Sequence, residues 1–310
     1  MKVIFNMHVS VLLKETIDSL LLNEDSICVD CTLGYGGHSK EVLKRIKRGW
    51  LFAFDQDAEA IKYSQKELEK IGNNFEIIKS NFINIKEELN KRDKYKVDRI
   101  LFDLGVSSPQ LDNADRGFSY HSDSNLDMRM DKDNELNAEV VVNEYSQEKL
   151  TKIFYEYGEE KYSKSISRSI CKYRKNKRIT NTLELVDIIK SSVPTKYKLD
   201  KHPARRVFQA IRIEVNNELE CLERALEESI NILNSKGIIC IITFHSLEEN
   251  IVKKIIKKYG EVDKIFKNLP EIPKEYLPII KLVKKIKPSN NEIEINNRSR
   301  SAKLFVIEKI

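Results

Sequence analysis

Residues 29–39 read VDCTLGYGGHS, a short apolar strand that runs into a glycine-rich turn and then into a helix. Gly34, Gly36 and Gly37 let the backbone adopt positive φ and approach a ligand closely, and the N–H groups that open the next helix point into the same space. The pattern is not the dinucleotide fingerprint G-x-G-x-x-G, because Ser39 stands at its third glycine, and it lacks the Lys-Ser/Thr ending of a P-loop. The turn therefore indicates a nucleotide-type cofactor without deciding which one.

A carboxylate follows at the end of the next strand. Residues 50–55, WLFAFD, end in Asp55 about twenty residues after Gly34, where such folds hold a ribose diol. The expected elements are, in order, a helix at 8–22 capped by Ser10, a β-α-β unit at 26–57 with its helix at 39–47, a helix at 58–71, and strands at 75–82 and 97–104. Strands and helices that alternate in this way predict a parallel sheet covered on both faces.

The alternation stops after the fourth strand. A fifth strand is expected at 238–244, behind a long amphipathic helix at 209–235 that Gly237 ends. We therefore expect a core domain of residues 1–109 and 209–310, and an inserted helical domain at 110–208. The remaining expected elements are helices at 147–157, 162–173 and 183–191, a helix through residue 258, a Pro-rich and Lys-rich loop, and a final strand after a basic turn at 298–303.

Composition limits the class of protein. The 310 residues carry a net charge of +6, and 41% of them are hydrophobic. No apolar run approaches the roughly 20 residues of a membrane span. The N-terminus lacks a signal-peptide pattern, so a cytoplasmic protein without a membrane partner is expected. Five scattered cysteines are no disulfide framework, and Cys28 and Cys31 are predicted to be core residues. No metal-ligand cluster has a usable spacing.

Positive charge gathers in two places. Residues 250–310 carry 15 Lys and Arg against seven Asp and Glu. The helix at 162–173 presents a basic face without any acidic residue between 161 and 178, and this face consists of Lys161, Lys164, Arg168, Lys172 and Lys175. Such a stripe repels itself unless something anionic lies across it. We weigh a contact with a phosphate backbone at least equally with a solvated lysine face.

The strand ends predict a cofactor. In an open α/β sheet, ligands bind beyond the carboxyl ends of the strands. Those ends are residues 34–38, Asp55, Phe82, 103–110 and 245–246. A glycine turn, a ribose-binding carboxylate and a third strand end that could flank an adenine fit S-adenosylmethionine, which has no pyrophosphate and needs no third glycine. From pattern alone, a methyltransferase and other nucleotide-using enzymes stay equally weighted.

Several blocks in a fixed order then identify a family. They are HVSVLL (8–13), the turn at 30–39, DLGVSSPQLD (103–112), RGFSY (116–120), LDMRMD (126–131), FQAIRI (208–213), FHSLE (244–248) and RSRSAK (298–303). Over essentially its whole length, the chain resembles the bacterial 16S ribosomal RNA (cytosine-N4)-methyltransferases. The resemblance implies an α/β fold: a class I, Rossmann-like methyltransferase core with a mostly parallel, doubly wound sheet and an inserted helical domain for RNA recognition.

The resemblance also implies an activity, which is transfer of a methyl group from S-adenosyl-L-methionine to the exocyclic N4 amine of a decoding-centre (P-site) cytidine. The substrate would be 16S rRNA within the small (30S) ribosomal subunit, and a homodimer stays open. The family's cofactor positions carry over onto Gly36, Gly37, His38, Asp55, Phe82, Asp103 and Gln110. The candidates for holding the RNA backbone are Lys164, Arg168, Lys172, Arg205, Arg206, Arg212, Arg298 and Arg300.

The candidate catalytic residues follow the fourth strand. Amino-methyltransferases commonly place a polar, Pro-containing motif there, and residues 107–110, SSPQ, occupy that place without the usual aromatic ending. We hypothesise that Ser107, Ser108 or a backbone carbonyl of this loop accepts a hydrogen of the target amine. Asp103 would hold the cofactor or orient the loop.

The roles of two polar residues stay open. Asp127 is weighed equally as a catalytic residue or as a partner of Arg129 or Arg116, and His245 as a catalytic residue or as a helix cap. The chain departs from the family at residues 249–250, Glu-Asn in place of Asp-Arg, and at Phe305, where an arginine is common. The rival functions are a methyltransferase of DNA or another RNA, and a ribosome-assembly factor whose cofactor only stabilises an RNA-binding fold.

Overall fold

The computed structural model describes residues 10–200, 202–262, 265–266 and 271–310, without the side chains of residues 199 and 200. The chain forms two compact units, one made of Met1–Gly105 and Leu219–Ile310 and the other of Val106–Glu218. Among the described residues, no helix combines the length and the apolar content that crossing a membrane requires.

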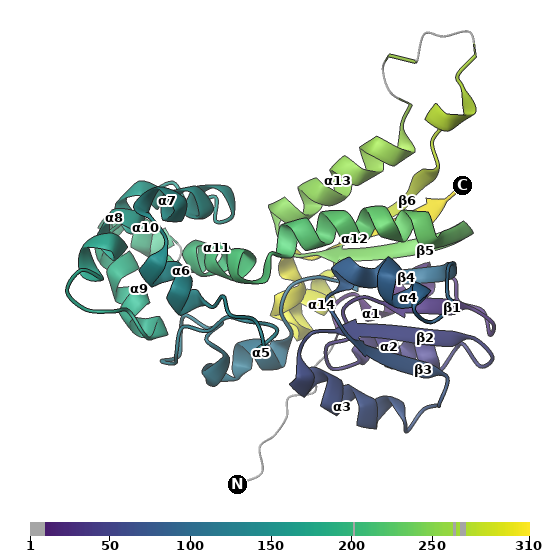
Figure 1. Cartoon of the computed structure of the whole chain (residues 1–310), viewed down its shortest axis with the longest axis horizontal. Coiled ribbons are helices and arrows are strands. Elements are labelled where there is room, and N and C mark those ends of the chain that lie inside the picture. Colours follow the sequence, from purple (N-terminus) through teal and green to yellow (C-terminus); the bar gives the residue numbers. More distant parts are fainter. Residues whose placement is uncertain (1–9, 201, 263–264, 267–270) are drawn as a thin grey trace. The chain divides into compact units, whose positions relative to one another are not determined.

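Unit one is built on a seven-stranded sheet of order β3-β2-β1-β4-β5-β7-β6 (Figure 1). Its strands are β1 (Ile27–Asp30), β2 (Trp50–Asp55), β3 (Phe75–Lys79), β4 (Val97–Asp103), β5 (Leu233–Thr243), β6 (Ile280–Ile286) and β7 (Lys303–Lys309). The strands from β3 to β5 pair in parallel, whereas β7 runs antiparallel to both β5 and β6. The expected α/β class with a mostly parallel sheet is therefore confirmed.

Helices cover both faces of this sheet. Successive side chains of a strand point to opposite faces, so Phe52 and Phe54 join a core with α4, α12 and α13, while Leu51 and Ala53 join a core with α1, α2 and α3. The helices are α1 (Leu13–Ser19), α2 (Gly37–Leu43), α3 (Ala58–Leu68), α4 (Ile85–Asn90), α12 (Glu218–Ile232), α13 (Ser246–Gly260) and α14 (Asn290–Ile295). The sheet is thus doubly wound, as the alternation of strands and helices predicts.

The two cysteines around the end of β1 are core residues. Cys28 and Cys31 are both buried and carry free thiols. Burial raises the pKa of each thiol well above its ordinary value, which keeps both protonated and unreactive. Their predicted role as small apolar residues is confirmed.

Unit two is the helical insertion. Its helices are α5 (Ser108–Asp112), α6 (Ala138–Glu144), α7 (Gln147–Glu156), α8 (Ser163–Tyr173), α9 (Thr182–Ser191), α10 (Thr195–Asp200) and α11 (Ala204–Asn216). The ends of α7, α8 and α9 agree with the sequence prediction to within one residue. Phe154, Ile170 and Ile211 are among the side chains of its own buried core.

Short 3₁₀ helices occur in both units. Unit one contains η1 (Phe82–Asn84), η3 (Lys274–Tyr276) and η4 (Asn297–Ser301), and unit two contains η2 (Ala114–Arg116).

The prediction of one long helix at 209–235 is wrong. The segment forms two helices, α11 and α12, separated by Asn217 at φ 49° and ψ 38°. Asparagine accepts this left-handed conformation more readily than most residues. Apolar spacing continues across the break, so periodicity alone does not reveal it. The last residues of the expected helix, 233–235, belong instead to β5.

The first helix is shorter than expected. The prediction of a helix at 8–22 with Ser10 as its cap is wrong, because α1 spans Leu13–Ser19 and Leu12 precedes it at φ 51°. The backbone N–H of Leu12 donates to Glu292 Oε1 over 2.6 Å, so α14 fixes the start of α1. Residues 8 and 9 of this expectation lie outside the described part of the chain.

The strand β6 lies in the segment expected to be a Pro-rich and Lys-rich loop. Its sequence is IKLVKKI, and Ile280 is its only buried side chain. An edge strand pairs on one side only, and lysines on it discourage pairing with another chain. The loop prediction is wrong there, because charges that protect a sheet edge look like those of a solvated loop.

Candidate active site

Three carboxylates end three neighbouring strands of unit one. Asp30 is the last residue of β1, Asp55 of β2 and Asp103 of β4. The sheet places β1 between β2 and β4, and all three strands run parallel. The carboxylates therefore meet at one edge of the sheet, the edge at which open α/β folds bind their ligands.

The glycine turn packs too closely to admit side chains. Gly36 has φ 75°, a conformation that favours glycine, and Gly37 begins α2. A Cβ on Gly37 would lie 1.8 Å from Oγ of Ser10, which is itself buried. A Cβ on Gly36 would lie 3.2 Å from Oγ of Ser64. The turn thus depends on glycine at both positions.

Asp55 ties the second strand to this turn. Its Oδ2 accepts a 2.7 Å hydrogen bond from the backbone N–H of Gly34, and its Oδ1 accepts one of 2.8 Å from that of Asp57. Burial raises the pKa of Asp55 to about 6, although the backbone hydrogen bonds oppose the shift. Each carboxylate oxygen keeps a lone pair, so Asp55 can still accept hydrogen bonds from a ribose.

His38 and Asp103 form a pair across the same edge. Nδ1 of His38 lies 3.4 Å from Oδ2 of Asp103. Burial lowers the pKa of His38, but the hydrogen bond with Asp103 and the charges of Asp103 and Asp30 outweigh it, so the pKa lies above its ordinary value. Within the described residues, Nε2 of His38 and Oδ1 of Asp103 are buried and have no hydrogen-bond partner.

Sequence reasoning missed a hydrogen-bond network beneath this pair. Asp30 accepts a 2.6 Å bond from Ser39 Oγ and a 3.0 Å bond from the N–H of Thr32. Thr32 Oγ1 in turn accepts a 2.7 Å bond from the N–H of Asp103, which fixes the end of β4. Burial raises the pKa of Asp30 despite these donors. A signal was present, because Asp30 ends a strand just as Asp55 does.

Phe82 supplies an apolar surface after β3. It begins η1, which Asn81 caps by accepting a 2.9 Å hydrogen bond from the N–H of Ile83. The Phe82 ring meets the Phe102 ring edge-on, with centroids 5.7 Å apart and planes at 85°. One part of the ring thus packs on the core while the side chain stays partly exposed.

These residues fit the expected S-adenosylmethionine. The buried Oδ1 of Asp103 would accept from an ammonium or hydroxyl group, and Nε2 of His38 offers a further polar contact. Gly36 and Gly37 leave room for a close approach of the ligand to the backbone. Asp55 and Phe82 would hold the ribose and the adenine. Unit one therefore brings together the predicted cofactor residues Gly36, Gly37, His38, Asp55, Phe82 and Asp103.

The other predicted site residues of this part of the sequence lie in unit two. Ser107 caps α5: its Oγ accepts from the N–H of Gln110 over 3.4 Å, and Gln110 Oε1 accepts from the N–H of Ser107 over 3.0 Å. Ser108 is the first residue of this helix. The structure thus gives Ser107 and Gln110 a capping role, and their catalytic and cofactor roles stay predictions.

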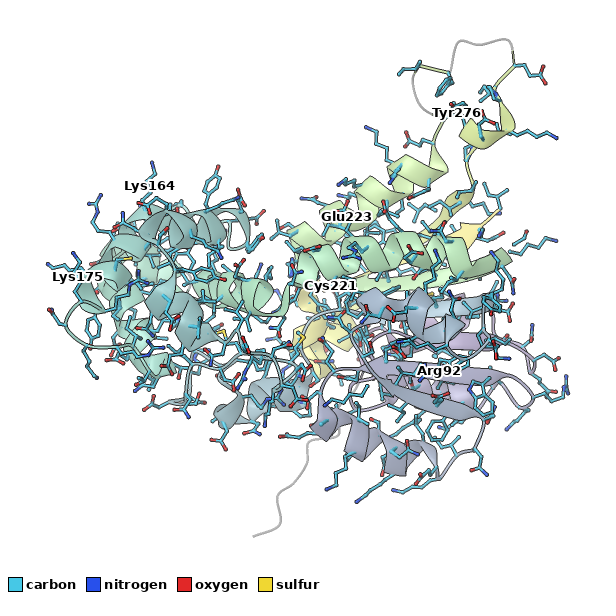
Figure 2. All side chains as sticks on the ribbon, in the orientation of Figure 1. Arg92, Lys164, Lys175, Cys221, Glu223 and Tyr276 are labelled. Carbon is cyan, nitrogen blue, oxygen red and sulfur yellow. The ribbon has the colours of Figure 1, made fainter. Side chains whose placement is uncertain are left out.

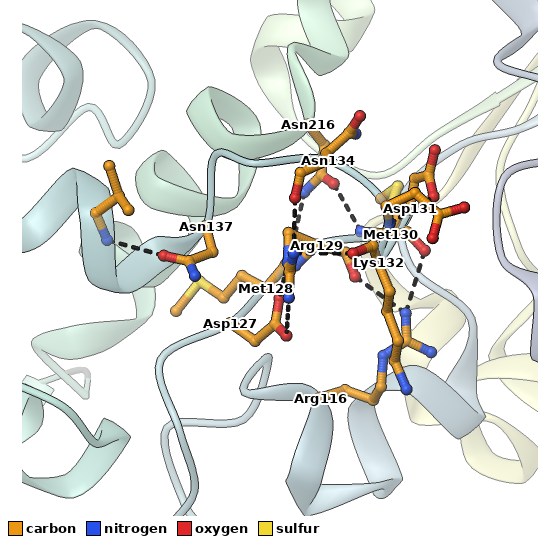
Figure 3. Close-up of polar contacts among 12 residues, drawn as sticks. Arg116, Asp127, Met128, Arg129, Met130, Asp131, Lys132, Asn134, Asn137 and Asn216 are labelled. Carbon is orange, nitrogen blue, oxygen red and sulfur yellow. Dashed lines mark hydrogen bonds and ion pairs between the residues drawn. The ribbon is translucent and has the colours of Figure 1, made fainter.

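A polar network in unit two surrounds Asp127 (Figure 3). Asp127 pairs with Arg129 through two contacts, 2.7 Å from Oδ1 to Nε and 3.0 Å from Oδ2 to Nη2, and the pKa of Asp127 is lowered. Arg116 is buried and donates to the carbonyl oxygens of Arg129 and Met130. Asn216 Oδ1 accepts from the N–H of Met130 over 2.8 Å. Of the roles weighed for Asp127, the pairing with Arg129 is the one that these contacts show, and it holds this loop in shape.

His245 lies at the start of a helix in unit one. It is the N-cap of α13, where its Nδ1 accepts from the N–H of Glu248 over 3.4 Å. Glu248 Oε2 accepts in return from the N–H groups of Phe244 and His245. Of the two roles weighed for His245, the helix cap is the one that these contacts show, and the catalytic role stays a prediction.

The predicted RNA contacts differ in how they are paired. Lys164, Arg168 and Lys172 lie exposed on α8, and none forms an ion pair with another described residue. Figure 2 shows Lys164 and Lys175 projecting outward from this unit. Of the other candidates, Arg205 is exposed, and so are Arg298 and Arg300 on η4. Arg206 donates a hydrogen bond to the Glu159 carbonyl oxygen. Arg212 forms two 2.8 Å hydrogen bonds with the carboxylate of Glu218.

Comparison with known proteins gives the family. The MraW methylase family matches residues 6–310. Ribosomal RNA small subunit methyltransferase H of Mesoplasma florum is 52% identical over 309 residues, which cover 97% of this chain and 99% of that protein. Two solved structures are similar at lower identity. An rRNA methylase from Streptococcus thermophilus is 12% identical with a TM-score of 0.45, and the match covers 96% of this chain and 95% of that one. A putative rRNA-methylase from Clostridium thermocellum is 13% identical with a TM-score of 0.46, and the match covers 98% of this chain and 100% of that one. Since the family match spans nearly all residues and the relative is identical at half of them, the chain belongs to the MraW methylase family.

Proposed function

We propose that this S-adenosylmethionine-dependent methyltransferase methylates the exocyclic N4 amine of a decoding-centre cytidine in 16S rRNA of the small (30S) subunit. The main support is the 52% identity, over 97% of the chain, with the relative named for methylation of small-subunit ribosomal RNA. When bound, S-adenosylmethionine supplies an electrophilic methyl group. A ribosomal substrate places the reaction in the cytoplasm.

The target amine needs help from the protein. Its lone pair is delocalised into the pyrimidine ring, so an acceptor for one amine hydrogen returns electron density to the nitrogen. We assign that acceptor to Ser107, Ser108 or a backbone carbonyl of their loop. Among the residues that the structure describes, Ser107 Oγ accepts a long 3.4 Å bond from the N–H of Gln110, and a hydroxyl oxygen has a second lone pair for this task. Alignment of the reacting atoms at about 3 to 3.5 Å supplies much of the remaining acceleration.

Asp103 has a different role in this proposal. Its Oδ2 contacts His38 and its N–H donates to Thr32, so the side chain is held in one orientation. Its Oδ1 is buried without a hydrogen-bond partner among the described residues, and in this proposal it would accept from the cofactor. Preorganised polar groups contribute without rearrangement during the reaction.

The basic face of α8 would hold the RNA backbone. Its cations Lys164, Arg168 and Lys172 are exposed, whereas the nearby Lys177 and Arg178 pair with acidic residues of the same unit. Unpaired cations on one helix face are what a phosphate backbone recruits. The target base must also leave its stack, or be presented unstacked, before it can react.

One experiment tests the reaction. Purified small subunits without native modifications receive label from S-adenosylmethionine, and their nucleosides are then analysed. An N4-methylcytidine peak that disappears in Asp103→Ala is expected. A label on DNA or on another nucleoside would contradict the assigned substrate. If the protein binds the cofactor but labels no nucleoside in subunits, rRNA or DNA, that result would contradict an enzymatic role and favour an assembly factor.

Two variant sets test the assigned residues. Ser107→Ala combined with Ser108→Ala should lower kcat by about 10²-fold or more, in line with the usual contribution of a positioned proton acceptor. Unchanged turnover would remove these side chains from the mechanism. The triple variant Lys164→Gln, Arg168→Gln and Lys172→Gln should raise KM for subunits at an unchanged kcat. Its control is Lys177→Gln with Arg178→Gln, since those two cations already have partners.

A further inference from the structure

A single buried carboxylate in unit one gathers three lysines. Glu249 lies in the first turn of α13, and its Oε1 is 2.8 Å from Nζ of both Lys253 and Lys285. Its Oε2 contacts Nζ of Lys303. The lysines come from α13, β6 and β7 respectively, so the cluster joins three elements. These contacts hold the pKa of Glu249 far below its usual range.

The positive charge of the three lysines exceeds the negative charge of Glu249. Three ammonium groups face one carboxylate, and each ammonium has three donors, so several donors remain unused. The side chain of Lys253 is 55% exposed, and those of Lys285 and Lys303 are 33% and 32% exposed. An approaching anion would therefore meet donors that are already positioned.

Other lysines of α13 behave differently. Lys254 pairs with Glu223 and Lys258 with Glu227, one cation to one carboxylate, along the contact between α13 and α12. Figure 2 marks Glu223 on this helix pair. Lys254 and Lys258 are thus each neutralised by one carboxylate, whereas the lysines at Glu249 outnumber their carboxylate.

The cluster sits at the functional edge of unit one. Lys303 pairs in register with Thr243, the last residue of β5, and Asp103 pairs with Ile242. Lys285 is opposite Phe305 on β7, and its Nζ lies 4.9 Å from the Phe305 ring centroid. Because β7 runs antiparallel to β5, its first residue lies where the parallel strands end. Lys285 and Lys303 therefore lie at the edge of the sheet that also carries Asp103, and Glu249 joins Lys253 of α13 to them.

We propose that Lys253, Lys285 and Lys303, held together by Glu249, bind a phosphate of the RNA strand that carries the target cytidine. The inference rests on the proposed function, since it adds a backbone contact to the same substrate. Phosphate contacts position a nucleic acid without reading its sequence. Glu249 acts as the organiser, because three like charges would otherwise repel one another and spread apart.

The test uses the full-length chain and a fluorescein-labelled single-stranded RNA. The dissociation constant is measured between about 50 and 200 mM salt for the wild type, Lys253→Gln with Lys285→Gln, and the control Lys254→Gln with Lys258→Gln. Loss of one phosphate contact should lower the magnitude of the slope of the logarithm of the dissociation constant against the logarithm of the salt concentration by about 0.7. We expect that loss in the first pair and the wild-type slope in the control.

The outcomes separate this site from the proposed reaction. An unchanged slope in the first pair, an equal loss in the control, or no RNA binding by the wild type would overturn the phosphate site. Lys285→Arg keeps the positive charge and should keep the wild-type slope, which would tie the loss in the first pair to charge. In methyl transfer to subunits, the first pair should raise KM at an unchanged kcat. RNA binding with the expected slopes but without N4-methylcytidine would instead contradict the proposed function alone.

Discussion

Nδ1 of His38 lies 3.4 Å from Oδ2 of Asp103, so the start of α2 is joined to the end of β4 by one buried pair. Removing one member leaves the other without its charged partner. A buried histidine beside a carboxylate is more easily protonated than a free one, which makes the fold depend on pH.

The first prediction concerns this dependence. The pKa of His38 is raised above 6.5, so its stabilisation is complete below that value and is lost as pH rises through the pKa of the folded state. In Asp103→Asn the loss in free energy of unfolding should be larger below about pH 6.5 than in alkaline solution. Urea unfolding followed by circular dichroism measures it. A loss that is equal at both pH values would show that the pair does not carry the effect.

The second prediction concerns the glycine turn. Gly37→Ala places a Cβ 1.8 Å from Ser10 Oγ, so the turn must shift. We expect a loss of about 1–3 kcal/mol in the free energy of unfolding, as for other overpacked sites, together with weaker binding of S-adenosylhomocysteine by calorimetry. Gly37→Ala combined with Ser10→Gly removes the clashing atoms and should recover both properties. If it recovers neither, the clash is not the cause.

The third prediction follows from Asp55. Its pKa of about 6 means that the carboxylate becomes protonated, and loses acceptor capacity, just below neutral pH. Affinity for S-adenosylhomocysteine should fall as pH drops through this value, by up to about tenfold per pH unit. The dissociation constant is measured by calorimetry from pH 8 to about pH 5. Asp55→Asn should bind weakly with a flat profile, and a variant that keeps the wild-type profile would assign the titration to another group.

The sequence predicts well which carboxylates meet at the strand ends of unit one, for a physical reason. Asp55 and Asp103 follow apolar strands, and parallel strands bring their carboxyl ends to one edge whatever the details of packing. Gly36 and Gly37 mark the turn because few other residues fit it. The bonds among Asp30, Thr32 and Ser39 escape such reasoning, since short polar side chains leave no periodic trace and their partners are decided only by packing.

The Lys-rich C-terminal part shows the opposite limit. The edge strand β6 exposes its lysines and buries only Ile280, so it lacks the apolar alternation of a half-buried strand. The contact of Glu249 with Lys285 depends on that strand being present. A lysine surplus is visible in composition, but its gathering around one carboxylate requires the pairing of β6 with β7.

The last prediction tests the break between α11 and α12. Asn217 has φ 49°, which costs most residues roughly 1–2 kcal/mol but costs glycine little. Asn217→Ala should therefore unfold at a lower urea concentration than Asn217→Gly, with a difference of about 1 kcal/mol between the two variants. Both variants lose the asparagine side chain, so its contacts cancel in the comparison. Equal stability of the two would mean that a continuous helix is accessible here, and that apolar periodicity, rather than the conformation of Asn217, governs this segment.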